Sequence, residues 1–149
     1  MMRAALVLCD FAEVDVASGK VHMIGAGWTS TGPMPGPHSV VAFMPVPPDR
    51  VKDPLAITLR LLDKTGEVVA VPSLGGPQPV EIRGQVELAP AADWNGTTPL
   101  SGIFSINLTM VLPLAAGQSY RWSLEIDGKE AATTEFYVRT NPGPEVEQG

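Results

Sequence analysis

The segment Gln118–Val138, QSYRWSLEIDGKEAATTEFYV, predicts an antiparallel β-hairpin around which the fold is organised. In its first half, large apolar residues alternate with polar ones, as in a strand that packs one face on a core and turns the other to water. Asp127-Gly128 in the middle is typical of a tight hairpin turn, because both residues tolerate a positive φ angle. We therefore expect the largest side chains of the segment to lie in the core: Tyr120, Trp122 and Phe136.

Three further segments show the same alternation and are expected to be strands: residues 55–61, 80–88 and 102–110. Turn-forming residues at 63–66 connect the first of these strands to the apolar segment 67–71, which predicts a second hairpin. Regular alternation indicates that each of these strands has one buried face and one face in contact with solvent.

The N-terminal segment, residues 3–11, is apolar at both odd and even positions, which favours a strand that is covered on both faces. A loop connects it to a second strand at residues 20–24. Two glycines then interrupt the apolar pattern, and a glycine inside a strand marks a bulge or a close approach of another backbone. Gly25 and Gly27 are therefore predicted to occupy positions where the backbone geometry requires glycine.

Fifteen glycines and fifteen prolines recur between the apolar segments, which predicts frequent turns and leaves no room for long helices. Three stretches rich in these residues are expected to be rigid loops: residues 31–37, 72–79 and 89–99. Together the patterns predict an all-β fold, an antiparallel β-sandwich of about eight strands resembling immunoglobulin or fibronectin domains. A closed β-barrel is the alternative, because alternation does not say whether a sheet closes on itself.

The length of the chain fits a single sandwich domain over residues 1–139. The remaining residues, 140–149, contain proline, glycine and three glutamates with almost nothing apolar. We therefore expect residues 140–149 to form a disordered acidic tail.

Composition argues against several classes of partner. The net charge of −6 and the scattered basic residues disfavour nucleic-acid binding. No segment approaches the ~20 apolar residues of a membrane span, and the N-terminal apolar run ends at Asp10 without a cleavage pattern, so a cytoplasmic protein is expected. The single cysteine, Cys9, lies inside that apolar run and is expected to be a small buried hydrophobe.

Catalytic and metal-binding groups are sparse. Only two histidines occur, His22 and His38, and no second cysteine could complete a zinc site with them. The closest group of carboxylates is Asp10, Glu13 and Asp15, and its spacing matches no calcium motif. The sequence does not decide whether this group binds a cation. No motif for a serine or cysteine nucleophile is present. The sequence therefore predicts a protein that is not an enzyme and has no cofactor.

Two tryptophans outside the predicted hairpin, Trp94 and Trp28, are candidates for ligand binding, because aromatic rings on a sandwich surface can stack on a sugar or hold a peptide. Trp94 lies in the loop of residues 89–99 and has the better claim to exposure. A loop ring can also fold back as a lid on the end of the sandwich, which is the favoured interpretation of Trp94.

Four short motifs follow one another along the chain: Leu8-Cys9-Asp10, Gly19-Lys20, Gly25-Ala26-Gly27-Trp28, and Tyr120-Arg121-Trp122 followed by an Asp-Gly turn. In this order they resemble a family of small uncharacterised bacterial domains, mostly actinobacterial. The resemblance spans most of the chain and implies an all-β domain, and the family has no assigned function.

These observations predict a non-catalytic protein-binding or assembly module. It would act through its rigid proline- and glycine-rich loops or by pairing a strand edge with a protein partner or with a second copy as a homodimer. A carbohydrate- or small-ligand-binding module that uses Trp94 and Trp28 is the alternative.

Overall fold

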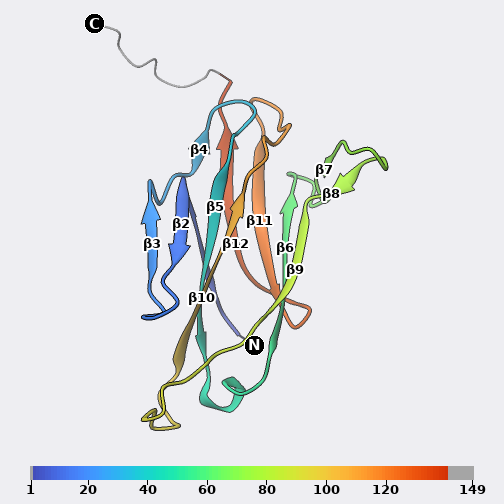
Figure 1. Cartoon of the computed structure of the whole chain (residues 1–149). Helices are drawn as coiled ribbons and strands as arrows, with labels where there is room; N and C mark the ends of the chain where they lie inside the picture. Colours follow the sequence, from blue (N-terminus) through green and yellow to red (C-terminus); the bar gives the residue numbers. More distant parts are fainter. Residues whose placement is uncertain (1, 141–149) are drawn as a thin grey trace, which may run out of the picture.

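Two β-sheets face each other across a shared apolar core in the computed structural model, which describes residues 2–140 (Figure 1). The small sheet has three antiparallel strands in the order β1-β5-β10. Its strands are β1 (Ala5–Cys9), β5 (His38–Val46) and β10 (Leu100–Leu108).

The large sheet has five strands in the order β4-β12-β11-β6-β9. Its strands are β4 (Ser30–Thr31), β6 (Leu55–Leu62), β9 (Glu81–Val86), β11 (Ser119–Ile126) and β12 (Lys129–Val138). Every neighbouring pair is antiparallel except β12 and β4, which run parallel over two residues. This parallel pair departs from the prediction of a purely antiparallel sandwich.

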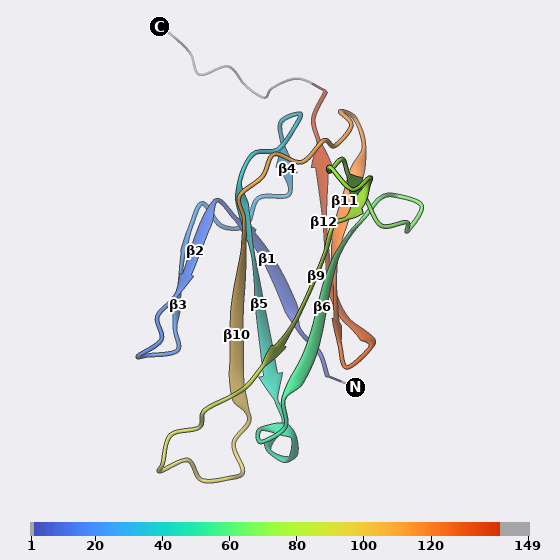
Figure 2. The same ribbon diagram turned by 45° about the vertical axis from the view of Figure 1, so that its right-hand side comes forward.

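Three short features complete the described fold. A hairpin of β2 (Phe11–Val14) and β3 (Val21–Ile24) lies outside the small sheet, so that Figure 2 shows hairpin, small sheet and large sheet side by side. A second, two-residue ladder joins β7 (Ala70–Val71) to β8 (Gln78–Pro79). A single 3₁₀ turn, η1 (Pro48–Arg50), follows β5.

The main core fills the space between the two sheets and contains the predicted faces of the alternating strands. Every second residue of β6 from Leu55 to Leu61 is buried, and so is every second residue of β11 from Tyr120 to Ile126. Trp122 is fully buried, and Tyr120 pairs directly with Phe136 across the hairpin, with their rings stacked at 6.1 Å. The β-sandwich prediction is confirmed, and within residues 2–140 no sheet closes into a barrel.

A second, smaller core lies between the β2–β3 hairpin and the outer face of the small sheet. Its fully buried members are Cys9, Ala12 and Val41, with Met23 and Ile103 packed against them. The small sheet is therefore apolar on both faces, which explains why residues 3–11 carry apolar side chains at both parities. Burial also raises the pKa of the Cys9 thiol, which keeps it protonated and unreactive.

Three local predictions differ from the structure in the extent or the pairing of a strand. Residues 3–11 do not form one strand, because the chain bends at Asp10 and β2 leaves the small sheet to pair with β3. The predicted hairpin of β6 with segment 67–71 is short: it consists of the bridge Leu62–Val68 and the hydrogen bond from the Val69 amide to the Leu61 carbonyl at 2.8 Å, and β9 lies beside the rest of β6. The loop 72–79 contains β8.

The described structure ends one residue into the predicted tail. The prediction of a disordered segment at residues 140–149 thus falls almost wholly on residues outside the described range.

Candidate functional site

A hollow of about 520 Å³ opens at the end of the sandwich where the chain passes from β3 to β4 and β5. We call it the Trp28 hollow. Its wall combines a glycine-rich corner, the proline-rich loop before β5 and one residue after β12: Asp10, residues 25–28, 30–31 and 35–38, and Arg139. The site brings together residues that lie far apart in the sequence.

The glycine-rich corner holds the hairpin against the small sheet. Gly25 has φ +64°, and a Cβ there would lie 2.2 Å from the Asp10 carboxylate. Gly27 has φ +93°, and its amide donates a hydrogen bond to the Leu8 carbonyl at 2.8 Å. Both positions lie in the left-handed region that favours glycine. A close approach and two backbone bends account for the Gly-x-Gly spacing.

Trp28 and His38 form the inner wall of the hollow. Their rings meet edge to face at 5.4 Å, and Trp28 makes a similar contact with Phe136 at 5.8 Å. His38 is 5% exposed, and its Nδ1 lies 3.2 Å from the Gly36 carbonyl, which accepts the hydrogen bond in the Nδ1–H tautomer. Burial lowers the pKa of His38, so the ring is neutral near pH 7. This neutral histidine belongs to the packing of the wall.

Arg139 supplies the positive charge of the hollow. Its main-chain amide donates to the Thr31 carbonyl at 2.8 Å, and its Nη1 donates to the Ser30 hydroxyl at 2.9 Å. Within residues 2–140, no carboxylate lies within ion-pair distance of the guanidinium. The half-buried Arg139 and the exposed Asp10 therefore give the hollow one group of each charge.

The carboxylates considered for a cation site do not converge. Asp15 binds within its own turn, where its carboxylate accepts hydrogen bonds from the Ser18 hydroxyl and the Ala17 amide. These bonds lower its pKa. Glu13 lies on β2 opposite His22, whereas Asp10 faces Gly25. Across the described residues, no group of three potential ligands is placed to hold a metal ion.

The two candidate tryptophans lie at opposite ends of the sandwich. Trp28 packs on His38 at the start of β5, while Trp94 precedes β10, whose first residue pairs with the last residue of β5. The length of β5 is about 27 Å at 3.4 Å per residue. Trp94 is half-buried, packs against the main core and donates from its indole to the Thr98 carbonyl at 2.9 Å. Trp28 and Trp94 therefore cannot form one binding platform.

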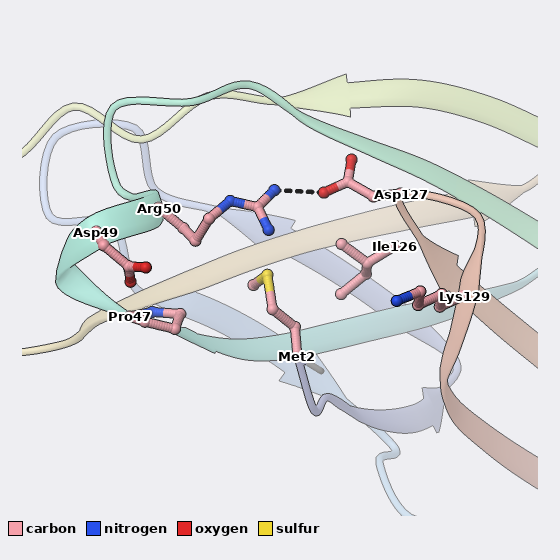
Figure 3. Close-up of a pocket in the computed structure, with 7 residues that line it drawn as sticks. All are labelled: Met2, Pro47, Asp49, Arg50, Ile126, Asp127 and Lys129. Atoms are coloured by element: carbon pink, nitrogen blue, oxygen red, sulfur yellow. Dashed lines mark hydrogen bonds and ion pairs between the residues drawn. The ribbon is translucent and has the colours of Figure 1, made fainter.

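A second hollow, of about 380 Å³, lies near the other end of the sandwich, between η1 and the turn of the β11–β12 hairpin. Figure 3 shows Arg50 pointing across it to Asp127, with which it forms an ion pair. Asp127 also accepts a hydrogen bond from the Ala56 amide at 3.1 Å, and its own amide donates to the Ala56 carbonyl at 2.8 Å. The ion pair ties η1, in the connection from β5 to β6, to this turn, and the bonds to Ala56 tie the turn to β6, so Arg50 and Asp127 are already engaged in holding the structure together.

The lateral sides of the sandwich differ in how their strand edges are covered. On one side, the Ala4 amide donates to the Ala131 carbonyl at 3.2 Å and joins the segment before β1 to β12. On the other side lie β10 and β9, the terminal strands of the small and large sheets. Within the described residues, the backbone of β10 is paired only with β5. We call the unpaired side of Leu100–Leu108 the β10 edge.

The β10 edge carries no charged residue and no proline over nine residues, LSGIFSINL. Four of its apolar side chains are only half-buried: Leu100, Ile103, Phe104 and Ile106. The β9 edge is shorter and contains Glu81 and Arg83. Charges and short length are the usual protections of an edge strand against pairing with another chain. The β9 edge has both protections, whereas the β10 edge has neither.

The fold and these surfaces define the molecule as an all-β sandwich with a hollow toward each end and one long strand edge without charge. The chain belongs to DUF6941, a family of unknown function, whose sequence model matches residues 4–139. This membership agrees with the resemblance to an uncharacterised family drawn from the short motifs. Searches of curated proteins and of solved structures each found no match. Within residues 2–140, no helix is long and apolar enough to cross a membrane.

Sequence reasoning missed both Arg139 as part of a site and β10 as an edge. Arg139 had no signal, because only the fold places it beside Ser30. For β10, the absence of charge over residues 100–108 is visible in the sequence. Its position at the end of a sheet depends on the pairing of β1 with β5, which the sequence pattern does not specify.

Proposed function

We propose that the protein is a non-catalytic binding or assembly module that takes up an extended strand along the β10 edge. The observation that carries the proposal is the nine-residue edge strand without charge or proline. An open edge presents a row of backbone donors and acceptors that another strand can satisfy, and its side chains select the partner. The half-buried Ile103, Phe104 and Ile106 offer apolar area that such a strand would cover.

The proposal keeps two predictions from the sequence. The first is that the protein acts in the cytoplasm. It does not bind nucleic acid, which rests on the net charge of −6 and on the dispersal of its basic residues.

Site-specific photocross-linking in cells tests the proposal. A photoreactive phenylalanine analogue is placed at Ser101 or Asn107, both exposed on β10, and at Gln85 on β9 as the control. Strand addition requires that the two β10 positions reach one continuous segment of the partner, at points about six residues apart. The Gln85 control should give no such segment. Cross-links scattered over unrelated segments, or equal capture from Gln85, would contradict the proposal.

A small-ligand module is a second candidate, favoured by the Trp28 hollow. The hollow places an indole beside an arginine and a carboxylate, and such groups can stack on a sugar ring and hydrogen-bond its hydroxyls. Trp94 takes no part in this version, because it lies at the other end of the sandwich.

Titrations with neutral disaccharides, followed by tryptophan fluorescence, test this candidate. Saturable binding that is lost in Arg139→Gln and Asp10→Asn, and retained in Trp94→Phe, would support it. Binding that depends on Trp94, or that survives both changes in the hollow, would exclude the hollow as the site.

A further inference from the structure

We infer that the strand added to the β10 edge is β10 of a second copy of the chain, in antiparallel orientation and centred on Phe104. This inference rests on the proposed function and names its partner. An antiparallel pair centred on Phe104 aligns all nine residues of β10 with their counterparts, and a register centred elsewhere aligns fewer. The two small sheets then form one continuous sheet across a twofold axis.

The side chains match in this register. On the face toward the main core, Leu100 lies opposite Leu108, and Gly102 lies opposite Ile106. Gly102 has no side chain, and a Cβ there would be in tight contact with the end of the Met44 side chain at 3.1 Å, so the branched Ile106 of the second copy meets a position without bulk. On the outer face, the polar Ser101 lies opposite Asn107. Ile103 lies opposite Ser105, which is the one pair of unlike polarity, and in the other pairs apolar residues meet apolar residues or glycine and polar residues meet polar ones.

Electrostatics makes the β10 edge the better of the two edges for pairing with a second copy. Two copies of a chain with net charge −6 repel each other over most approaches. β10 has no charged residue, so its direct pairing with itself places no like charges opposite each other. The β9 edge would carry Glu81 and Arg83 into the same contact, and it is the less suitable edge for self-pairing.

Two double variants test the register, because Ser101 and Asn107 are both exposed and lie opposite each other in the inferred dimer. In Ser101→Lys/Asn107→Lys, a lysine faces a lysine at two symmetric places. In Ser101→Glu/Asn107→Lys, a glutamate faces a lysine at the same two places. Within one chain the two positions are about 20 Å apart, too far to interact directly. Both variants also lose the hydrogen bond from Ser39 to Asn107 equally.

The measurement is light scattering after size exclusion at two concentrations a hundredfold apart. We expect a dimer for the wild type and for the Glu/Lys variant, and dimerisation about tenfold weaker or worse for the Lys/Lys variant. The Lys/Lys variant reduces the net charge from −6 to −4, so long-range repulsion cannot explain its loss. Added salt should reduce the difference in dimerisation between the Lys/Lys and the Glu/Lys variants, because it screens the charges. Gln85→Lys on β9 serves as the control and should remain dimeric.

The outcomes separate this inference from the proposed function. A dimer that the Lys/Lys variant weakens and the Glu/Lys variant preserves, with photocross-links from β10 to β10 in reverse order, supports both. A monomeric wild type, with cross-links from β10 to one segment of a different protein, overturns the second copy and leaves strand addition standing. A dimer to which both variants are indifferent, or which both weaken equally, overturns the register. A monomer without ordered cross-links overturns both.

Discussion

On the outer face of the large sheet, ion pairs join three neighbouring strands, whereas the outer face of the small sheet is covered by the β2–β3 hairpin. Arg60 on β6 binds Glu81 on β9 at 2.6 Å and Glu125 on β11 at 2.7 Å. The opposite surface of the small sheet holds Cys9 and Val41, both fully buried. One sheet therefore meets water with paired charges, and the other meets a third layer of protein.

The same contrast continues at the edges of the two sheets. The charges of the large sheet extend to its edge, where Arg83 binds Glu81 at 2.8 Å. The small sheet ends in the uncharged strand β10, and no strand among the described residues pairs with its outer side. The large sheet, whose outer face meets water, thus has a charged edge strand, whereas the small sheet, which is buried on both faces, has an edge strand without charge. This difference is the reason why we propose the edge of the small sheet, and not that of the large sheet, as the surface for contact with another chain.

The largest effect should come from the core that both sheets share. Trp122→Ala removes a fully buried side chain between them and should lower the free energy of unfolding by about 3–5 kcal/mol. Thr133→Ala, at an exposed position of the neighbouring β12, should change it by about 0.5 kcal/mol or less. Chemical denaturation measures both. Equal stability of the two variants would contradict the placement of Trp122 between the sheets.

A somewhat smaller effect is expected at the corner that leads from the hairpin over the small sheet to β4 on the large one. Gly25→Ala should cost about 2–3 kcal/mol, because alanine is strained at φ +64° and its Cβ would overlap the Asp10 carboxylate.

The Asp10→Ala background separates the two causes of this loss. There the overlap disappears and only the backbone strain remains, so Gly25→Ala should cost measurably less than in the wild type. A cost that is the same in both backgrounds would show that Asp10 does not pack against Gly25.

The outer faces of the two sheets can be compared directly with one pair of variants. Val41→Ala on the small sheet should cost about 1–2 kcal/mol, since Val41 is fully buried beneath the hairpin. Thr58→Ala on the outer face of β6 should cost about 0.5 kcal/mol or less. Thermal melting of the two variants checks the difference. A Val41→Ala variant that melts at the same temperature as the wild type would contradict the burial of this face beneath the hairpin.

The smallest effect should be at the ion pair between Arg50 of η1 and Asp127 of the β11–β12 turn. The hydrogen bond from Arg50 holds the pKa of Asp127 below its ordinary value of 3.8. A lowered folded pKa gives stability that is present above the ordinary value and is lost as the pH falls through the folded one. Asp127→Asn should therefore melt slightly below the wild type at pH 7, and the gap should narrow below about pH 4.

The asparagine variant is a conservative choice, because asparagine tolerates the positive φ of this turn and can still accept from the Ala56 amide. A gap between the two melting temperatures that is constant from pH 7 to pH 3 would mean that the ion pair does not contribute.

The sequence was informative wherever one face of a strand is buried and the other is solvated. The inward faces of β6 and β11 followed directly from alternation, because period two has only one interpretation there. Residues 3–11 were harder, since a segment apolar on both parities fits one long strand as well as it fits β1 and β2 with a bend at Asp10. Pairing partners were the other failure, because the local pattern does not say whether β9 or segment 67–71 lies beside most of β6.

The candidate surfaces were the least predictable part. The Trp28 hollow needs the loop before β5 and the end of β12 to meet, and long-range contacts of this kind leave no local pattern. The glycines of its corner were identified as backbone positions, but the carboxylate of Asp10 as the reason for Gly25 emerged only from the fold. The lack of charge in segment 100–108 can be read from the sequence. Its place at the edge of the small sheet is known only from the order of the strands.

Amide hydrogen exchange at two concentrations a hundredfold apart tests the contrast between the two edges most directly. If β10 pairs with a second copy, protection of residues 100–108 should increase with concentration, while protection of β9, residues 81–86, should stay the same. Exchange in β10 that is as fast as in β9 and independent of concentration would contradict self-pairing through the β10 edge.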